Sequence, residues 1–230
     1  MEDKTNENRI GDWVLYKNNQ FIAFNKPAGI PSQADQSNDK SMLQLAEIYT
    51  KQKLHLVHRL DRPASGILLF AKTKKAVQAI NAQFQARTVE KIYLAAVKEA
   101  PPIKEATLIH YIKKDKRSNS VRAFAHPQEG AKEARLSYRL LGSSTTYHLL
   151  AITLFTGRHH QIRAQLQAIG SPIKGDVKYG FKRGNRDRSI HLHAWKLAFQ
   201  HPISEKIEHI SAPLPQDPIW DFFTKNGCTQ

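Results

Sequence analysis

The spacing of apolar and polar positions predicts a chain built mainly of short strands. Residues 13–16 and 21–25 are apolar runs on either side of the polar residues 17–20, where an asparagine pair tolerates the positive φ of tight turns, so a β-hairpin is expected. The strands that we expect after this hairpin cover residues 54–57, 67–71, 89–97, 107–112, 121–125, 134–141, 145–155, 190–199 and 207–211. Strands that follow one another without regular alternation with helices favour an α+β fold with a largely antiparallel sheet.

Four helices with one apolar face each are expected among these strands. Two of them follow a hydroxyl residue that can cap the helix, Ser41 and Thr73. Their expected buried faces are Met42, Leu45, Ala46 and Tyr49 in the first, and Ala76, Val77, Ile80 and Phe84 in the second. The other two cover residues 159–169 and 218–225. The first of them, after Ser41, is predicted to be scaffold.

The loop between the strands at 54–57 and 67–71 has the most reactive composition in the sequence. It places one carboxylate, Asp61, among the side chains of His58, Arg59 and Arg62. Neighbouring positive charge favours the ionised form of a carboxyl group. An ionised aspartate could attack a carbon atom or accept a proton, or it could form an ordinary loop salt bridge.

The charge balance indicates a polyanionic partner. The chain has 35 Lys and Arg against 20 Asp and Glu, a net charge of +15 and a pI near 9.9. Contacts with phosphates release counterions and guide association, although a basic surface can also serve solubility alone. Two basic loops, 113–120 and 174–188, are candidates for phosphate contact, and the second contains Tyr179 and Phe181, which could stack on bases or anchor the loop.

Five sequence blocks resemble the RluA-type RNA pseudouridine synthases, in the order in which that family has them. The block HRLDRPASGILLFAK at 58–72 is similar to the family's catalytic motif. The others are FNKPAGIPSQ at 24–33, EKIYLAAV at 90–97, TGRHHQIRAQLQAIGSPIKGD at 156–176 and HLHAWKLAFQHP at 191–202. The resemblance implies a pseudouridine synthase catalytic fold, with flanking helices and an active-site cleft across a mixed, largely antiparallel central sheet.

The resemblance also implies the reaction, which isomerises uridine in ribosomal or transfer RNA to pseudouridine without a cofactor or a metal. In the family, the aspartate of the His-Arg-Leu-Asp motif is catalytic, which corresponds to Asp61 here. Tyr93 matches the tyrosine that stacks on the target ring, and Arg163 matches the arginine that pairs with the catalytic carboxylate. Whether Asp61 acts as a nucleophile or as a base is left open by the sequence.

Seven further residues are candidates for RNA binding or for building the pocket. Arg59 matches the family's arginine that helps to displace the target base, and a planar cation can offset part of the cost of flipping. The other six are Lys26, His58, Arg62, Arg158, His160 and Gln161. One position departs from the family pattern, because His159 stands where relatives usually have threonine or a similar small residue.

Two other functions were weighed against the isomerase. A non-catalytic RNA-binding or RNA-folding factor could have the same scaffold, but all the expected catalytic residues are present. A metal-dependent nuclease could use His159 and His160, or His191 and His193, but a zinc site usually needs three or more converging ligands. The sequence near these histidines does not supply them, so structural histidines are the preferred interpretation.

The remaining expectations concern domain organisation and location. Residues 1–11 are expected to be a flexible tail, and residues 12–230 a single catalytic domain without the S4-type RNA-binding domain of many relatives. Cys228 is the only cysteine, which excludes an intrachain disulfide. Neither a bilayer-spanning stretch nor a signal peptide is recognisable, so a cytoplasmic protein is expected, with a monomer as the simplest state.

Overall fold

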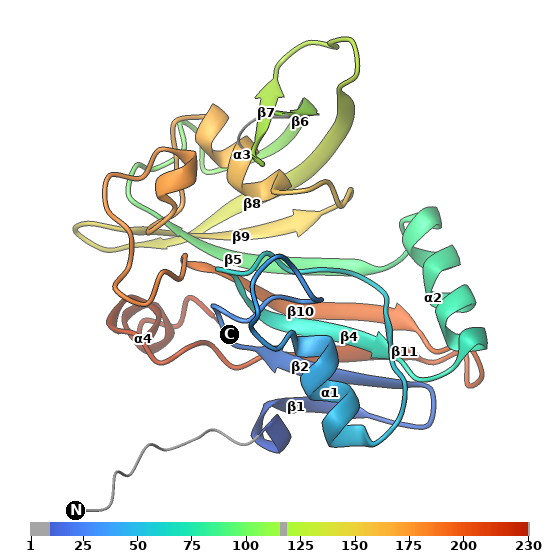
Figure 1. Cartoon of the computed structure of the whole chain (residues 1–230). Coiled ribbons are helices and arrows are strands. Elements are labelled where there is room, and N and C mark those ends of the chain that lie inside the picture. The colour runs from blue at the N-terminus through green and yellow to red at the C-terminus, as the bar shows by residue number, and fades with distance from the viewer. Residues whose placement is uncertain (1–9, 116–118, 230) are drawn as a thin grey trace, which may run out of the picture.

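The computed structural model describes residues 10–115 and 119–229, and the strands in these ranges form one 11-stranded sheet. The strand order is β1-β2-β4-β10-β5-β9-β8-β6-β7, with β3 beside β4 and β11 beside β10. β4 and β10 are parallel, and the other pairs are antiparallel. In Figure 1, β5 crosses the middle of the molecule, between a part with β2, β4 and β10 and a part with β8 and β9. The expected mixed, largely antiparallel α+β fold is confirmed.

The bounds of the elements agree with most of the expected segments. The strands are β1 (Val14–Lys17), β2 (Phe21–Lys26), β3 (His55–Leu56), β4 (Ser65–Ala71), β5 (Glu90–Val97), β6 (Glu105–Lys114), β7 (Val121–Phe124), β8 (Lys132–Ser143), β9 (His148–Leu154), β10 (Leu192–Gln200) and β11 (Ile207–Ser211). The helices are α1 (Met42–Thr50), α2 (Lys74–Ala86), α3 (Gln161–Ala168) and α4 (Pro218–Lys225), with short 3-10 turns at η1 (Ile10–Trp13) and η2 (Val177–Tyr179).

The expected N-terminal hairpin is present, and its turn chemistry is local. The side-chain oxygen of Asn18 accepts the backbone N–H groups of Gln20 at 2.8 Å and Phe21 at 2.7 Å. Such a side-chain-to-backbone turn is the reason that asparagine is favoured at this position. β1 and β2 consequently pair as an antiparallel hairpin.

The main hydrophobic core includes β2, β4 and β10 together with residues of α1 and α2, and it continues through β5, β8 and β9 to α3. Every residue of β4 is buried, which agrees with the continuous apolar run in its sequence. Phe21 and Phe199 meet edge to face with their ring centroids 5.1 Å apart, as do Phe24 and Phe70 at 6.0 Å. This dense packing gives β4 a fixed position, and the loop with Asp61 leads directly into it.

The predicted caps of α1 and α2 are confirmed, but one predicted core residue is not. Ser41 forms a reciprocal capping box with Gln44, and Thr73 accepts the N–H of Ala76. Tyr49 was expected to be buried, but it is 39% exposed. Its ring meets the edge of Phe24 at the margin of the core, with a centroid distance of 6.1 Å, so only part of the ring is covered.

α3 belongs to the other part of the molecule, where it packs against β6 and β7. A small core forms there from Ile112, Val121, Ala134, Ala164 and Tyr179. The helix begins at Gln161, two residues later than expected, because His160 has left-handed backbone angles (φ 51°, ψ 26°) that a helix cannot contain. Its first six residues are all buried, so this helix is an internal element.

The two faces of β5 belong to different layers. Tyr93 lies in the main core, whereas its neighbour Leu94 packs in a separate cluster with Leu149 and with Trp220 and Phe223 of α4. Because successive strand residues point to opposite faces, α4 covers the face of β5 that Tyr93 does not use. The expected catalytic residues are therefore on the face opposite α4.

Parts of the predicted ends and tips lie outside the described residues. The expected flexible tail lies outside them up to residue 9, while Ile10 and Gly11 belong to η1. Residues 116–118 of the basic loop at 113–120 also lie outside. Among the described helices, none combines the length and the apolar character needed to cross a bilayer.

Candidate active site

The loop with Asp61 is held by hydrogen bonds to its backbone from two distant segments, the loop after β2 and the residues before β10. The hydroxyl of Ser32 donates to the Leu60 carbonyl at 2.8 Å and accepts the Leu60 N–H at 3.0 Å. The Arg62 carbonyl accepts the Gly29 N–H at 2.8 Å, and the Pro63 carbonyl accepts the Ile190 N–H at 3.0 Å. Buried backbone groups that are all satisfied in this way fix the loop, and with it the start of the Asp61 side chain.

A close approach between β4 and β10 places the loop next to the centre of the sheet. Gly66, directly after the loop, has φ +108°, and a Cβ atom there would overlap the backbone of Ala194. Only glycine fits both the backbone angle and the space. The Ser-Gly of the catalytic motif is thus explained by the parallel pairing of Ser65 with His193 and of Gly66 with Ala194.

Arg163 connects Asp61 with a second carboxylate. Its Nη1 donates to Asp61 Oδ2 at 3.1 Å, while its Nε and Nη2 donate to the two oxygens of Asp176 at 2.7 and 2.8 Å. Burial opposes the charged form of Arg163, but the hydrogen bonds and charges of Asp176 and Asp61 outweigh burial and raise its pKa. The pairing of Asp61 with Arg163 that the sequence suggested is therefore present in the structure.

Tyr93 lies near enough to Asp61 for the charge of the carboxyl group to act on its hydroxyl. It is 7% exposed on β5, between Ala194 on β10 and Ile152 on β9. Burial, and then the negative charge of Asp61, raise the pKa of its hydroxyl. The phenol is thus neutral at physiological pH, and it forms part of the apolar floor near the carboxylate.

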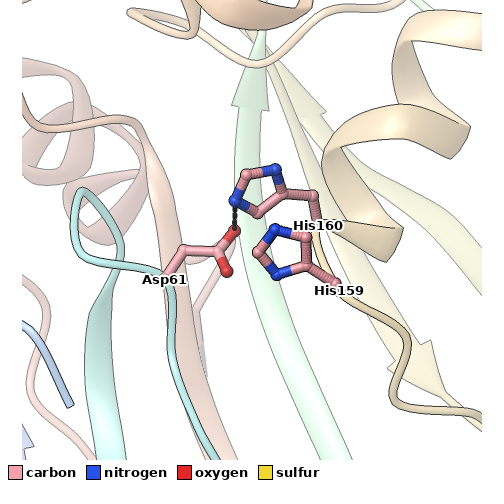
Figure 2. A group of neighbouring side chains, drawn as sticks. All are labelled: Asp61, His159 and His160. Carbon is pink, nitrogen blue, oxygen red and sulfur yellow. Dashed lines mark ion pairs between the residues drawn. The ribbon is translucent and has the colours of Figure 1, made fainter. Parts of the chain in front are cut away.

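Two histidines, at the residues just before α3, lie beside the carboxyl group of Asp61. Figure 2 shows the carboxylate pointing toward the rings of His159 and His160, and His160 Nε2 is 3.8 Å from Asp61 Oδ2. Burial, followed by the charge of Arg163, lowers the pKa of His160 to about 2, so the ring is neutral. The contact is therefore between a neutral imidazole ring and the carboxyl group of Asp61.

Tyr179 orients the ring of His160. Its hydroxyl oxygen accepts the Val121 N–H at 3.0 Å and lies 2.8 Å from His160 Nδ1. If the hydroxyl hydrogen is donated to Nδ1, the ring proton is on Nε2, which faces Asp61. The same tyrosine ring lies 4.8 Å from the guanidinium of Arg163, so it supports both groups that touch the carboxylate.

Lys26, one of the predicted RNA-binding residues, is buried behind the Asp61 loop. Lys26 is 0% exposed, and its Nζ donates to the carbonyls of Pro27 and Ile30 at 2.9 Å and of Arg62 at 3.3 Å. Burial lowers its pKa to about 7, against the effect of Asp61, which raises it. The buried side chain therefore supports the backbone of the Asp61 loop, which agrees with the pocket-building alternative expected for Lys26, and an RNA contact of Lys26 stays a prediction.

The side chain of Arg62 points away from Asp61. Its Nε donates to the Gly29 carbonyl at 2.8 Å, its Nη1 donates to Ser37, and its charge is paired with Asp35 and Asp39. These contacts tie the catalytic loop to the polar loop between β2 and α1. Arg62 is partly exposed, but the acidic partners compete with RNA for its guanidinium.

The other candidates divide between supporting and exposed positions. His58 Nε2 accepts the Leu69 N–H at 3.1 Å, and burial lowers the pKa of His58 to about 4. Gln161 is 3% exposed and joins Thr156 to the backbone of Arg158 and Arg135. Both side chains therefore have structural roles, and the RNA contact predicted for His58 stays a prediction.

Arg59 and Arg158 are the predicted RNA-binding residues that are exposed. Arg158 donates from Nε to the Glu133 carbonyl at 3.0 Å, which leaves part of its guanidinium for a ligand. Arg59 makes no side-chain hydrogen bond or ion pair within the described residues. It lies close enough to His159 to lower the pKa of that ring.

Sequence reasoning missed Asp176 and assigned no specific role to Tyr179. Asp176 is 1% exposed, and it is the main partner of Arg163. Asp176 ends the quoted block at 156–176, and a carboxylate in an otherwise basic segment was a usable signal. Arg163 could not be named as its partner, because the two residues are 13 positions apart and the whole turn after α3 lies between them.

The described residues contain one group of side chains that could hold a metal ion. The ligand atoms of Asp61, His159 and His160 lie within 4.8 Å of one another. The group does not fit a resident cation well, because Arg163 already donates to Asp61 Oδ2 and its positive charge would repel the ion. His191 and His193 do not converge either, since His191 pairs with Asp217 and His193 with Ser65. The nuclease hypothesis therefore has no support from these positions.

Two hollows in the described surface lie away from Asp61. One, of about 510 Å³, is lined by residues of α1 and its flanks, and the other, of about 280 Å³, is lined by strands β5, β6 and β8 to β10 together with Cys228. The candidate site is thus identified by its side chains, and the expected cleft at Asp61 stays a prediction.

Comparison with known proteins agrees with the geometry. A model of the family described as RNA pseudouridylate synthase matches residues 20–168. The chain is 41% identical over 163 residues to an uncharacterised RNA pseudouridine synthase of Chloroflexus aurantiacus, covering 70% of this chain and 50% of that relative. It is 34% identical to tRNA pseudouridine synthase C of Haemophilus ducreyi, covering 88% of this chain and 91% of the relative.

Other relatives differ in the RNA that their names give. Ribosomal large subunit pseudouridine synthase C of Vibrio parahaemolyticus is 30% identical, with 87% of this chain and 65% of that protein covered. Among solved structures, human RNA pseudouridylate synthase domain containing 1 covers 96% of this chain and 90% of its own, with a TM-score of 0.75 and 24% identity. The human domain containing 4 has a TM-score of 0.73 at 22% identity, with 96% of this chain and 94% of that chain covered. These two likenesses concern the fold alone.

Proposed function

The chain belongs to the family of RNA pseudouridine synthases, isomerases that act on uridine in RNA, and we propose that Asp61 carries out this reaction in a site completed by Tyr93 and Arg163. The observation that carries the proposal is the contact of 3.1 Å between Asp61 and Arg163, from segments 102 residues apart in the sequence. A loop salt bridge within the motif, the ordinary alternative, would have used Arg59 or Arg62. Asp61 instead pairs with the buried arginine of another motif.

The reaction requires only a few groups. The bond between uracil N1 and the ribose is broken, the base turns, and a bond from C5 to the same ribose carbon is formed. C5 then loses its proton to solvent and N1 gains a proton, so atoms and electrons balance without a co-reactant. An ionised carboxylate beside the sugar is the group that can add to carbon or remove a proton. Asp61 has a side chain 21% exposed, and its Oδ1 makes no hydrogen bond within the described residues, so this oxygen faces the reactants.

Arg163 and Tyr93 have different parts in this proposal. Arg163 holds Asp61 Oδ2 with a hydrogen bond of 3.1 Å from its charged guanidinium, which fixes the direction of the carboxyl group. Tyr93 supplies an apolar ring against which the detached uracil can stack while it turns. Its raised pKa keeps the phenol protonated, so that it can also donate a hydrogen bond.

We infer that the substrate is a stem-loop of transfer or ribosomal RNA, since the relatives named for their substrate divide between these two classes. The net charge of +15 favours phosphate contact. We infer that Arg59, which is exposed and two residues before Asp61, fills the gap that a flipped uridine leaves. A planar guanidinium can stack there and bind phosphate at the same time.

Release of tritium from RNA labelled at C5 of uridine tests the proposal. RNA extracted from cells that lack this gene is the substrate, and comparison of its pseudouridines with those of normal cells locates the target. Asp61→Asn should reduce release by at least about 10³-fold, because the reactive group is removed, while the Kd for RNA stays within about threefold. Asp221→Asn, an exposed carboxylate on α4, is the matched control. Full activity of Asp61→Asn, or loss of RNA binding by it, would contradict the assignment.

A further inference from the structure

His159 and His160 form an unusual stack of neighbouring residues. Their ring centroids are 3.8 Å apart, and the rings are inclined by 24°. Neighbouring side chains in a helix or a strand point in different directions, so such a stack needs an irregular backbone. His160 supplies it with its positive φ of 51°, a conformation that residues other than glycine adopt infrequently.

The position of His159 differs from that of His160, although the rings are parallel. His160 is anchored by Tyr179, whereas His159 is exposed, and the backbone of Asn119 lies near enough to act on its pKa. Within the described residues, the ring contact of His159 is with His160, which covers one of its faces. His159 is thus an exposed aromatic ring that is oriented by its stack on His160 and lies beside Asp61.

The ring is uncharged at neutral pH. Burial of the part that touches His160 lowers the pKa of His159, and the charges of Arg59 and Lys114 act in the same direction. Asp61 and the backbone of Asn119 act against them, but the pKa remains lowered. His159 therefore neither pairs with Asp61 as a cation nor displaces Arg163 from it.

Exposure increases in order from the floor of the site to its mouth. Tyr93 is 7% exposed, the Asp61 side chain is 21% exposed, and His159 belongs to the exposed residues. His159 is therefore the aromatic side chain at the outer edge of the group formed with Tyr93 and Asp61, where a nucleotide next to a flipped uridine would enter. Unpaired bases in RNA are commonly bound by stacking on aromatic side chains, including histidine.

We propose that the outer face of His159 stacks on the unpaired base that flanks the target uridine. This proposal rests on the proposed function, and it assigns to His159 a role in substrate binding. Arg59 and Lys114, which lie near the ring, then bind the phosphates of the same strand. A small side chain at position 159 would offer no such plane.

The stack can be removed in two ways, by replacing the ring of His159 or by deleting the flanking base from the RNA. The probes are stem-loop RNAs with the mapped uridine, in which either the 5′ or the 3′ flanking nucleotide is intact or abasic. On intact RNA, His159→Ala should raise KM and Kd by roughly 10-fold, the usual effect of losing one base–aromatic stack, with kcat within about twofold. His159→Phe, which keeps the ring plane, should stay within about twofold of the original protein. His209→Ala, an exposed histidine on β11, is the matched control.

The abasic RNAs decide whether the effect is stacking. On the RNA that lacks the stacked base, the original protein and His159→Ala should bind equally. The stack is already absent from this RNA, so removal of the ring costs no further binding energy in the double-mutant cycle. An equal penalty of His159→Ala on intact and abasic RNAs, or no penalty on intact RNA, would overturn the proposal. Since Kd is measured independently of turnover, failure of the isomerase assignment would appear separately, as an absence of tritium release from the original protein.

Discussion

The two loops that meet at Arg163 offer the same kind of carboxylate in opposite settings. Asp176, in the loop after α3, is 1% exposed and accepts two hydrogen bonds from the guanidinium. Asp61, in the loop before β4, is 21% exposed and accepts one. Both oxygens of Asp176 accept hydrogen bonds from Arg163, whereas Asp61 accepts through Oδ2 and keeps Oδ1 for a substrate.

This difference shows how a reactive aspartate can be held without being neutralised. The paired hydrogen bonds from Arg163 to Asp176 fix the plane of the guanidinium, since two parallel bonds leave it little freedom. The remaining Nη1 then has a set direction and meets Asp61 Oδ2. Asp176 is therefore expected to serve stability and positioning, and Asp61 chemistry.

Substitution of the two carboxylates should separate these roles most clearly. Asp176→Asn leaves a buried guanidinium without its main counter-charge, so we expect a loss of about 3–5 kcal/mol in unfolding free energy and a fall in kcat as well. Asp61→Asn should change the unfolding free energy by less than about 1 kcal/mol. Urea unfolding followed by circular dichroism measures both, with the exposed Asp187→Asn as control. Equal destabilisation by the two variants would remove the distinction.

Arg163→Lys tests whether the fork geometry matters or only the charge. A lysine ammonium is a point charge on a flexible stem and cannot hold Asp176 through two fixed bonds while directing a third at Asp61. We expect kcat to fall about 100-fold, as small displacements of a catalytic group commonly cost, with KM within about threefold. Single-turnover tritium release measures the effect. A kcat within twofold of the original would mean that charge alone is sufficient.

Acid should weaken the support of the Asp61 loop through His193. This buried ring bonds Ser65, which follows the loop, at 2.8 Å, and burial lowers its pKa to about 4. The unfolded chain, with a histidine pKa near 6.5, binds more protons between these values, so stability falls as the pH drops from about 6.5 toward 4.

One such histidine lowers the unfolding free energy by about 2 kcal/mol between pH 7 and pH 5. His193→Gln should remove this share of the pH dependence of Tm, whereas His209→Gln, an exposed histidine, should leave it unchanged. An unaltered acid slope in His193→Gln would show that other groups cause it.

Metal removal should have the smallest effect. Asp61 faces two histidines, but Arg163 occupies one of its oxygens and disfavours a cation there. Dialysis against EDTA should therefore change tritium release by less than about twofold. A loss of activity that Zn²⁺ or Mn²⁺ restores would mean that Asp61 shares its open oxygen with a metal ion.

Local interactions made several features readable from the sequence. The Asn18 turn and the Ser41 and Thr73 caps join residues two or three positions apart, so the sequence contains both partners of each bond. Strand and helix positions followed from apolar periodicity for the same reason. Tyr49 was misjudged because an apolar position on a helix face does not reveal how far the core extends over it.

The sequence by itself determined the family resemblance, the order of the elements and the identity of Asp61 as the candidate reactive group. Only the tertiary structure decided the roles of Lys26 and Arg62, because both side chains could equally have turned toward RNA until the loops around them were in place. It also brought Asp176 to Arg163, and placed His159 beside Asp61. These contacts depend on the order of strands in the sheet and on irregular backbone, which act between residues far apart and leave no periodic pattern in the sequence.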